Sequence, residues 1–372
     1  MESPLPDSRA PRSSAPEPPA LRVVAWEITR RCPLRCRHCR AGAEDVRYEG
    51  ELTTGECMRV LDNIAGFASP IVILTGGEPM SRGDFLSIVE YGSSLGLRMA
   101  AAPCGPLVTD ESAEAMKAAG IKRISLSLDG ADAGTHDAFR GFPGSFESVL
   151  SAAGAARRAG LEFQINTTFS SLNLHQLDEI IALAERIGAV AFHPFLLVPT
   201  GRGEGLREYE ISAEAYEGTL HRLYEKSLES GLELKPTCAP HYYRVFRQRE
   251  KEAGRAVTPQ SHGMAAMTKG CLGGQGFVFL SHTGKLQICG FLDIEAGDLR
   301  GADFDFASLW REAPLFRDVR SVDDYGGKCG ICEYRRVCGG CRARAYAATG
   351  DYMAEEPRCS YVPQGGKGSG EK

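Results

Sequence analysis

Short apolar runs alternate with amphipathic stretches between residues 22 and about 234 of this 372-residue chain. Strand-like runs occupy residues 23–28, 71–74, 97–102, 124–128, 163–167 and 190–196. Helix-like stretches fall near 54–66, 84–95, 110–119, 146–159 and 176–187, and another follows at 212–229. The alternation predicts an α/β fold in which crossover helices cover a parallel sheet. Because the six units are fewer than the eight of a closed barrel, we expect a partial (βα)6 TIM-type barrel over residues 21–234, with its active site at the carboxyl ends of the strands.

The pattern changes on both sides of this region. Residues 1–20 contain six prolines and little to bury besides Leu5, so we expect a disordered segment. Residues 235–269 are mixed and polar and read as a connecting arm. Residues 270–362 carry glycine-rich turns, a predicted hairpin (277–280 and 286–288) and seven cysteines, so metal is expected to stabilise this small domain. The glycine-rich end, 363–372, reads as a flexible tail.

Composition narrows the class of protein. With 43% hydrophobic and 24% charged residues the chain can bury a sizeable core, and its net charge of −5 attracts neither nucleic acid nor an anionic membrane. No apolar run is long enough to cross a bilayer, and the beginning lacks the apolar region of a signal peptide. We therefore expect a cytoplasmic protein with no membrane partner. Thirteen cysteines in a reducing compartment indicate metal binding.

The first cysteine cluster, Cys32-x3-Cys36-x2-Cys39, directly follows the first predicted strand. Three thiolates can fill three of the four iron corners of a cubane cluster. The open iron is then a position for substrate, as at catalytic metal sites. Zinc, or a disulfide with a spare thiol, is the alternative; structural zinc normally takes four protein ligands, and no fourth lies nearby in sequence.

A glycine-rich stretch, Thr75-Gly76-Gly77-Glu78-Pro79, follows the second predicted strand. Together with the three cysteines it resembles the radical S-adenosylmethionine (SAM) superfamily. The resemblance implies a [4Fe–4S] cluster that chelates SAM through its open iron, and reductive cleavage of SAM to methionine and a 5′-deoxyadenosyl radical. His38 stands where many members have an aromatic residue, and its planar ring can still pack against adenine.

The same resemblance implies further contacts with SAM. Gly76, Gly77 and Glu78 would bring backbone groups and a carboxylate to the methionine ammonium, since glycine permits close approach of the backbone. By position, four residues after the fourth and fifth strands resemble ribose and carboxylate contacts: Ser127, Asp129, Asn166 and Thr168. Helix capping is the alternative role for these four.

The C-terminal run Cys329-x2-Cys332-x5-Cys338-x2-Cys341 is preceded by Cys271 and Cys289 and followed by Cys359. Alone it fits a zinc ribbon as readily as iron–sulfur. Its spacing resembles the SPASM extension of radical SAM enzymes, which implies one or two auxiliary [4Fe–4S] clusters. By resemblance, Cys329, Cys332, Cys338 and Cys359 would hold one cluster, and Cys271, Cys289 and Cys341 would hold another that lacks a fourth ligand. Cys238, in the predicted arm, is our candidate for that ligand.

Residues 195–203, 276–284 and 329–346 resemble the tetrapyrrole-modifying radical SAM enzymes of the alternative, siroheme-dependent heme pathway, above all the heme b synthases. This implies oxidative decarboxylation of two propionates of Fe-coproporphyrin III to vinyl groups, an electron donor such as flavodoxin or ferredoxin, and an auxiliary cluster as electron conduit. For the propionates we predict Arg202, Arg342 and Arg344, because guanidinium binds carboxylate in bidentate fashion. His241 is a candidate ligand of the porphyrin iron.

Three other functions stay open at this point. A sister tetrapyrrole enzyme, of the didecarboxysiroheme deacetylase or heme d1 type, has the same motifs. A SPASM peptide maturase is the next, although residues 1–20 are too short and proline-rich for a leader-binding domain. A non-catalytic zinc-binding scaffold would need a basic face, which the net charge of −5 disfavours.

Overall fold

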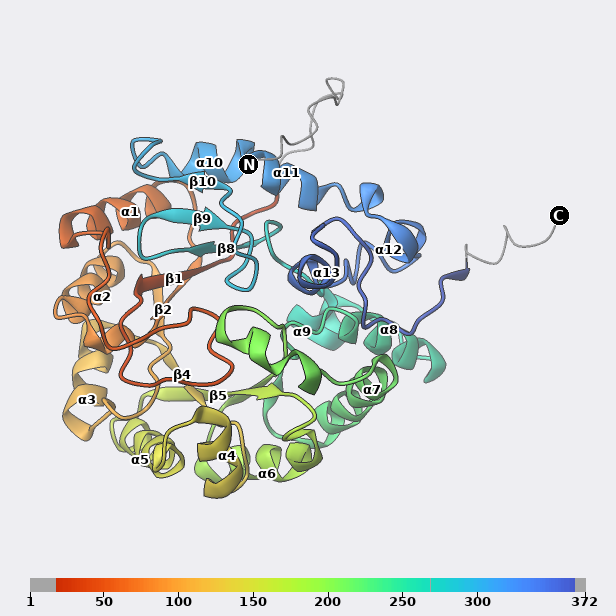
Figure 1. Ribbon diagram of the computed structural model, residues 1–372, viewed down its shortest axis with the longest axis horizontal. Coiled ribbons are helices and arrows are strands. Elements are labelled where there is room, and N and C mark those ends of the chain that lie inside the picture. The colour runs from red at the N-terminus through yellow and green to blue at the C-terminus, as the bar shows by residue number, and fades with distance from the viewer. Residues whose placement is uncertain (1–17, 268, 365–372) are drawn as a thin grey trace.

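One sheet of ten strands organises the computed structural model, which describes residues 18–267 and 269–364 (Figure 1). Most of the predicted disordered segment and of the predicted tail lies outside these residues. The strand order is β10-β9-β8-β1-β2-β3-β4-β5-β6-β7. The first six strands are β1 (Val23–Thr29), β2 (Ile71–Gly76), β3 (Arg98–Ala101), β4 (Arg123–Ser127), β5 (Glu162–Phe169) and β6 (Ala191–Leu196).

These six strands are parallel neighbours, so the predicted parallel sheet of a partial barrel is confirmed. Helices form an arc around the outside of the strands in Figure 1. They are α1 (Thr54–Phe67), α2 (Phe85–Ser94), α3 (Asp110–Ala119), α4 (Ala133–Arg140), α5 (Ser145–Arg158), α6 (Leu177–Ile187) and α7 (Ala213–Glu229). The amphipathic pattern predicted all of them except α4, whose eight residues are too few for a clear periodicity.

Helix α1 illustrates why these segments fold locally. Thr53 accepts a hydrogen bond from the backbone N–H of Glu56, and the Glu56 side chain accepts one from the backbone of Thr53, which together form a capping box. Cys57, Val60, Leu61 and Ile64 are buried at helical spacing against the sheet. Cys57 is therefore a core residue.

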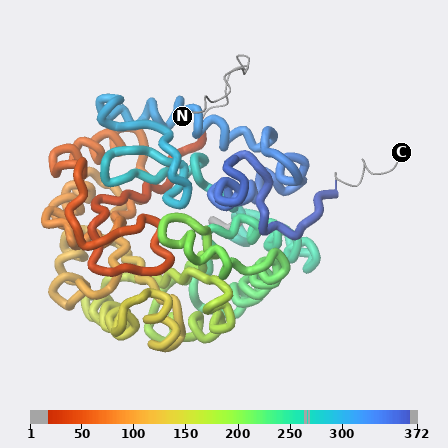
Figure 2. Tube along the Cα trace, in the orientation of Figure 1, coloured from red at the N-terminus to blue at the C-terminus, as the bar shows by residue number. Residues whose placement is uncertain are grey.

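The C-terminal part adds strands to the same sheet. It contains β7 (Glu233–Leu234), β8 (Phe277–Leu280), β9 (Lys285–Gln287) and β10 (Gly297–Asp298), and the helices α8 (Tyr242–Glu252), α9 (Pro259–Met267), α10 (Phe306–Glu312), α11 (Pro314–Arg320), α12 (Gly327–Ile331) and α13 (Arg342–Thr349). The β8–β9 hairpin forms as predicted, but β8 also pairs in parallel with β1, Val24 opposite Val278. Figure 2 shows the two segments side by side. The division into barrel, arm and small cysteine-rich domain stays a prediction.

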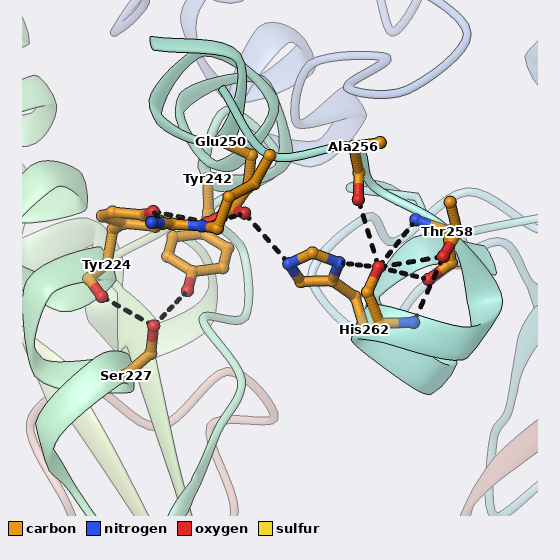
Figure 3. Close-up of polar contacts among 9 residues, drawn as sticks. Tyr224, Ser227, Tyr242, Glu250, Ala256, Thr258 and His262 are labelled. Atoms are coloured by element: carbon orange, nitrogen blue, oxygen red, sulfur yellow. Dashed lines mark hydrogen bonds and ion pairs between the residues drawn. The ribbon is translucent and has the colours of Figure 1, made fainter. Parts of the chain in front are cut away.

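The predicted polar arm forms α8 and α9, which are fixed to α7 by a buried carboxylate (Figure 3). Glu250 is 1% exposed and accepts hydrogen bonds from Tyr224 Oη at 2.5 Å and from Arg255 Nη2 at 2.8 Å. His262 Nε2, on α9, lies 3.0 Å from the other carboxylate oxygen. The contacts lower the pKa of Glu250 to about 2, the hydrogen bond from Arg255 contributing most.

No helix in the described ranges is both long and apolar enough to span a bilayer.

Candidate functional site

The first three cysteines lie in the loop that leaves the carboxyl end of β1. Cys32 and Cys36 are buried and pack with Leu34 and Ala43, and Cys39 lies against the same cluster with a free thiol like the other two. The loop is closed by its own backbone: Cys32 N–H donates to Glu44 at 3.0 Å, and Cys39 N–H donates to Cys36 at 3.2 Å. The sequence motif therefore folds into one group of three thiols, two buried and one partly buried, the donor set that a cluster with an open iron requires.

Arg202 holds this loop from the far side of the barrel. Its Nε donates to the carbonyl of Cys36 at 2.9 Å and its Nη1 to that of Ala43 at 2.8 Å, while its backbone N–H donates to Cys39 at 3.0 Å. Nη2 is buried without a hydrogen-bond partner. Most of the guanidinium is thus occupied by the cysteine loop, and the predicted contact with a propionate stays a prediction.

Gly76 and Gly77 let the end of β2 lie directly against the end of β1. Gly76 has φ +148, and a Cβ at Gly77 would stand 2.3 Å from the carbonyl oxygen of Arg31. Instead, Gly77 N–H donates to Thr29 at 2.9 Å and Glu78 N–H donates to Arg31 at 2.8 Å. Only glycine permits this approach, which brings Glu78 beside the cysteine loop.

Glu78 is fully buried, and no cationic side chain lowers its pKa. Its oxygens accept hydrogen bonds from the backbone of Met80 at 2.9 Å and of Cys104 at 2.6 Å. Burial raises the pKa of Glu78, although these bonds oppose the shift. A buried carboxylate that lacks a counter-charge fits the ammonium group of SAM.

Asp129 is also buried, but its carboxylate is occupied. Arg140 Nε donates to it at 2.8 Å, and the backbone N–H of Thr168 donates at 2.7 Å. Although burial opposes it, the charge of Arg140 keeps the pKa of Asp129 below its usual value. Arg140 Nη1 in turn donates to Cys36 Sγ at 3.4 Å. Asp129 therefore orients an arginine toward a cluster thiol, and its predicted contact with SAM stays a prediction.

The other predicted SAM contacts lie on the strands beside this pair. Ser127 and Asn166 are register partners on β4 and β5, half-buried on the same face as Thr168. His38 packs its ring on Phe139, with centroids 4.6 Å apart. Burial lowers the pKa of His38 to about 4, so the ring is neutral and available for stacking.

Four C-terminal cysteines line one pocket: Cys329, Cys332, Cys338 and Cys359. Backbone N–H groups donate to three of their sulfurs at 3.4 Å: Tyr334 to Cys332, Gly340 to Cys338 and Glu356 to Cys329. Hydrogen bonds of this kind stabilise and tune cluster thiolates. The structure thus brings together the four residues expected to share a cluster.

The two remaining predicted arginines point into the protein. Arg342 is 1% exposed, and its Nη1 donates to the carbonyls of Tyr352 and Ala354. Arg344 is 2% exposed, pairs with Glu356 at 3.3 Å, and donates to the carbonyl of Cys238 at 3.0 Å. Their role in substrate binding stays a prediction that these contacts do not support.

His241 lines the four-cysteine pocket. It is 1% exposed, and neither ring nitrogen has a hydrogen-bond partner. Burial lowers its pKa to about 4, so the imidazole is neutral. Binding of a porphyrin iron by this ring also stays a prediction.

The sequence reasoning missed a buried carboxylate near the carboxyl end of β1, beside the cysteine loop. Glu27 is fully buried and contacts His282 Nδ1 at 2.7 Å, Arg30 Nε at 3.0 Å and Arg40 Nη2 at 3.1 Å. These contacts link the cysteine loop to the β8–β9 hairpin. An acidic residue inside an otherwise apolar strand was the available signal.

Known proteins are similar to this chain in sequence over nearly its whole length. The Radical SAM superfamily profile matches residues 26–184. An AdoMet-dependent heme synthase of Nitratidesulfovibrio vulgaris is 51% identical over 359 residues, covering 96% of this chain and 97% of that protein. A second, of Oleidesulfovibrio alaskensis, is 48% identical over 354 residues, covering 95% and 91%. An Fe-coproporphyrin III synthase of Methanosarcina barkeri is 29% identical over 356 residues, covering 91% and 87%.

A solved structure shares the fold. Streptococcus suis SuiB bound to S-adenosylmethionine superposes with a TM-score of 0.71 at 14% identity, covering 92% of this chain and 78% of that one. At this identity the likeness concerns the fold alone. The sequence identity carries the assignment: the chain belongs to the radical SAM superfamily, in the family of the AdoMet-dependent heme synthases.

Proposed function

We propose that this chain is a heme b synthase that oxidatively decarboxylates two propionate side chains of Fe-coproporphyrin III. The observation that carries the proposal is the 51% identity with an AdoMet-dependent heme synthase over 96% of the chain. The three thiols and Glu78, which is hydrogen-bonded to the cysteine loop, support it, because such a reaction needs cluster ligands and a partner for the SAM ammonium.

Each round converts one –CH2–CH2–COO⁻ group into –CH=CH2. A hydrogen atom leaves the carbon attached to the ring and forms a C–H bond in 5′-deoxyadenosine. The bond to the carboxylate then breaks, CO2 departs, and one electron passes to an acceptor. Two rounds therefore consume two SAM, release two CO2 and yield two electrons.

The residues present fit a cluster and SAM. Cys32, Cys36 and Cys39 would hold a [4Fe–4S] cluster, which with SAM supplies the 5′-deoxyadenosyl radical. Glu78 would hold the methionine ammonium, and Arg140 stabilises the Cys36 thiolate by donating to its sulfur. A flavodoxin or ferredoxin is the class of partner that would deliver the electron that starts each round.

The porphyrin carboxylates need a basic lining, and the cysteine loop is rich in arginine. Arg30, Arg31, Arg35 and Arg40 in this loop form ion pairs with protein carboxylates. Arg37 and Arg47 of the same loop are exposed to solvent. We propose these two as propionate contacts, in preference to the buried arginines of α13.

The test is turnover of anaerobically reconstituted protein with Fe-coproporphyrin III, SAM and a reductant. We expect mono- and divinyl products by mass spectrometry, with two 5′-deoxyadenosine per heme, and neither with Cys36→Ala. Absence of vinyl products from a protein that cleaves SAM would overturn the proposal. Loss of acetate groups from didecarboxysiroheme in a parallel assay would then identify the sister activity.

A further inference from the structure

Cys238 occupies a strained position in the link between β7 and α8. Its φ of +53 lies in the left-handed region, which side chains other than those of glycine, asparagine and aspartate rarely adopt. The carbonyl of Cys238 accepts hydrogen bonds from Tyr216 Oη at 2.9 Å and from Arg344 Nη2 at 3.0 Å. Two side chains of other elements therefore hold the backbone of Cys238 in this conformation.

The same contacts bring Cys238 to the cysteines that lack a fourth partner. Arg344 lies on α13, three residues after Cys341. On the other side, Pro240 packs against Gly270, where a Cβ would stand 2.4 Å from the proline carbonyl oxygen. Gly270 directly precedes Cys271.

Cys289 is joined to this group through Gly273. A Cβ at Gly273 would stand 3.6 Å from Cys271 Sγ and 3.0 Å from the carbonyl oxygen of Ile288, the residue before Cys289. The N–H of Gly270 donates to the carbonyl of Val337 at 2.7 Å, and the N–H of Cys271 donates to that of Cys338 at 3.1 Å. The segment that carries Cys271 therefore lies against the segment that leads to Cys341.

All four thiols are free, and four thiolates at one site would repel one another unless cations lay between them. In the described ranges, no three His, Cys, Asp or Glu side chains lie close enough to hold a single metal ion. A four-iron cluster takes each thiolate on a separate corner, so its ligands need not converge on one metal ion. We propose that Cys238 is the fourth ligand of a second auxiliary [4Fe–4S] cluster, held with Cys271, Cys289 and Cys341.

The test measures iron in Cys238→Ala after anaerobic reconstitution of the full chain. We expect the loss of about one to four irons per chain, by conversion to a three-iron cluster or by loss of the cluster. Iron and sulfide analysis, together with Mössbauer and EPR spectroscopy, detects this loss of iron without an activity assay. Cys57→Ala, which removes another buried thiol, should keep its full iron content, and Cys329→Ala should change the spectrum of the other auxiliary cluster instead.

A retained change in the EPR signal of the first cluster on adding SAM shows that the Cys238→Ala protein is folded. Unchanged iron, sulfide and spectra in that protein would overturn the inference, and so would zinc in place of iron at this site. The inference rests on the proposed function only in needing clusters. If Cys238→Ala loses iron as expected but the wild-type protein leaves Fe-coproporphyrin III unaltered, the proposed function would be refuted and the assignment of Cys238 as a ligand would stand.

Discussion

At the scale of single residues, Gly76 and Gly77 decide whether the site can form. Gly77 lies so close to the backbone of Arg31 that a Cβ would stand 2.3 Å from its carbonyl oxygen. The atoms in the way are backbone of the cysteine loop, so relief requires displacing the loop itself. From the sequence motif, we predicted that these glycines let the backbone approach a ligand. The structure shows that they also let the end of β2 lie against the end of β1.

Gly77→Ala should therefore lower kcat/KM on the order of a hundredfold, since a misplacement of about 1 Å costs that much at a reacting centre. Gly83→Ala is the control, because nothing lies within 4 Å of a Cβ at that position. Initial rates of 5′-deoxyadenosine formation give the comparison. Equal rates in the two variants would show that the loop yields without cost.

Glu78→Gln should weaken SAM binding roughly ten- to a hundredfold, because a charge-assisted hydrogen bond is lost. The carboxylate form binds the ammonium, so binding is present above the pKa of Glu78 and is lost as the pH falls through it. Since burial raises that pKa, SAM affinity should fall with pH sooner than an exposed glutamate would allow. Anaerobic calorimetry should find this dependence in the wild type and not in Glu78→Gln.

At the scale of elements, the sequence could predict the features that local patterns determine, but not those that long-range contacts determine. The six strands and their long helices have strong periodicity, and α5, expected at 146–159, forms over Ser145–Arg158. Strand β8 was predicted as half of a hairpin, but its parallel partner β1 lies some 250 residues earlier, and no local pattern encodes that pairing. The contacts of Arg344 could not be predicted for the same reason, because they depend on Glu356 and on a carbonyl of another element, and its role toward the substrate stays a prediction.

The arm between barrel and cysteine-rich part depends on one carboxylate. Glu250→Gln should lower the free energy of unfolding by about 2 to 3 kcal/mol, since it removes charge from a buried group that holds Tyr224, Arg255 and His262. Glu252→Gln, on the same helix and exposed, should change it by less than about 0.5 kcal/mol. Denaturant titration of the two variants compares them, and equal midpoints would contradict a stabilising role for the network.

At the scale of the whole molecule, the cysteine-rich part is uneven in how it is stabilised. Its hairpin is held by the main sheet, and α10 and α11 bury Trp310 and Phe316 in the common core. From Tyr325 to the end of the described residues, most positions are half-buried or exposed, and five cysteines fall there. Metal should therefore supply much of the folding free energy of this last segment.

Within residues 22–364, removal of iron by a chelator should make residues 325–364 the first part to be cut by trypsin, at Lys328, Arg335, Arg336 and Arg358. The strands of the barrel should resist for longer, because their backbone is paired in the sheet whether or not iron is present. Mass spectrometry of the early fragments, with and without iron, gives the order of cleavage. The same order and rate in both samples would show that the segment folds without metal.

The pairing of β8 with β1 also has a consequence for synthesis on the ribosome. One edge of β1 has its partner soon, in β2, but the other must wait until residues near 280 have been made. At bacterial and eukaryotic elongation rates this delay is on the order of ten to fifty seconds. During that time an apolar strand with an unpaired edge, next to three reactive thiols, is open to wrong partners. The nascent chain is thus most vulnerable to oxygen and aggregation before its last quarter emerges. A chaperone or cluster carrier that acts during translation would protect the chain while the cysteine loop has been synthesised but the sheet around it is incomplete.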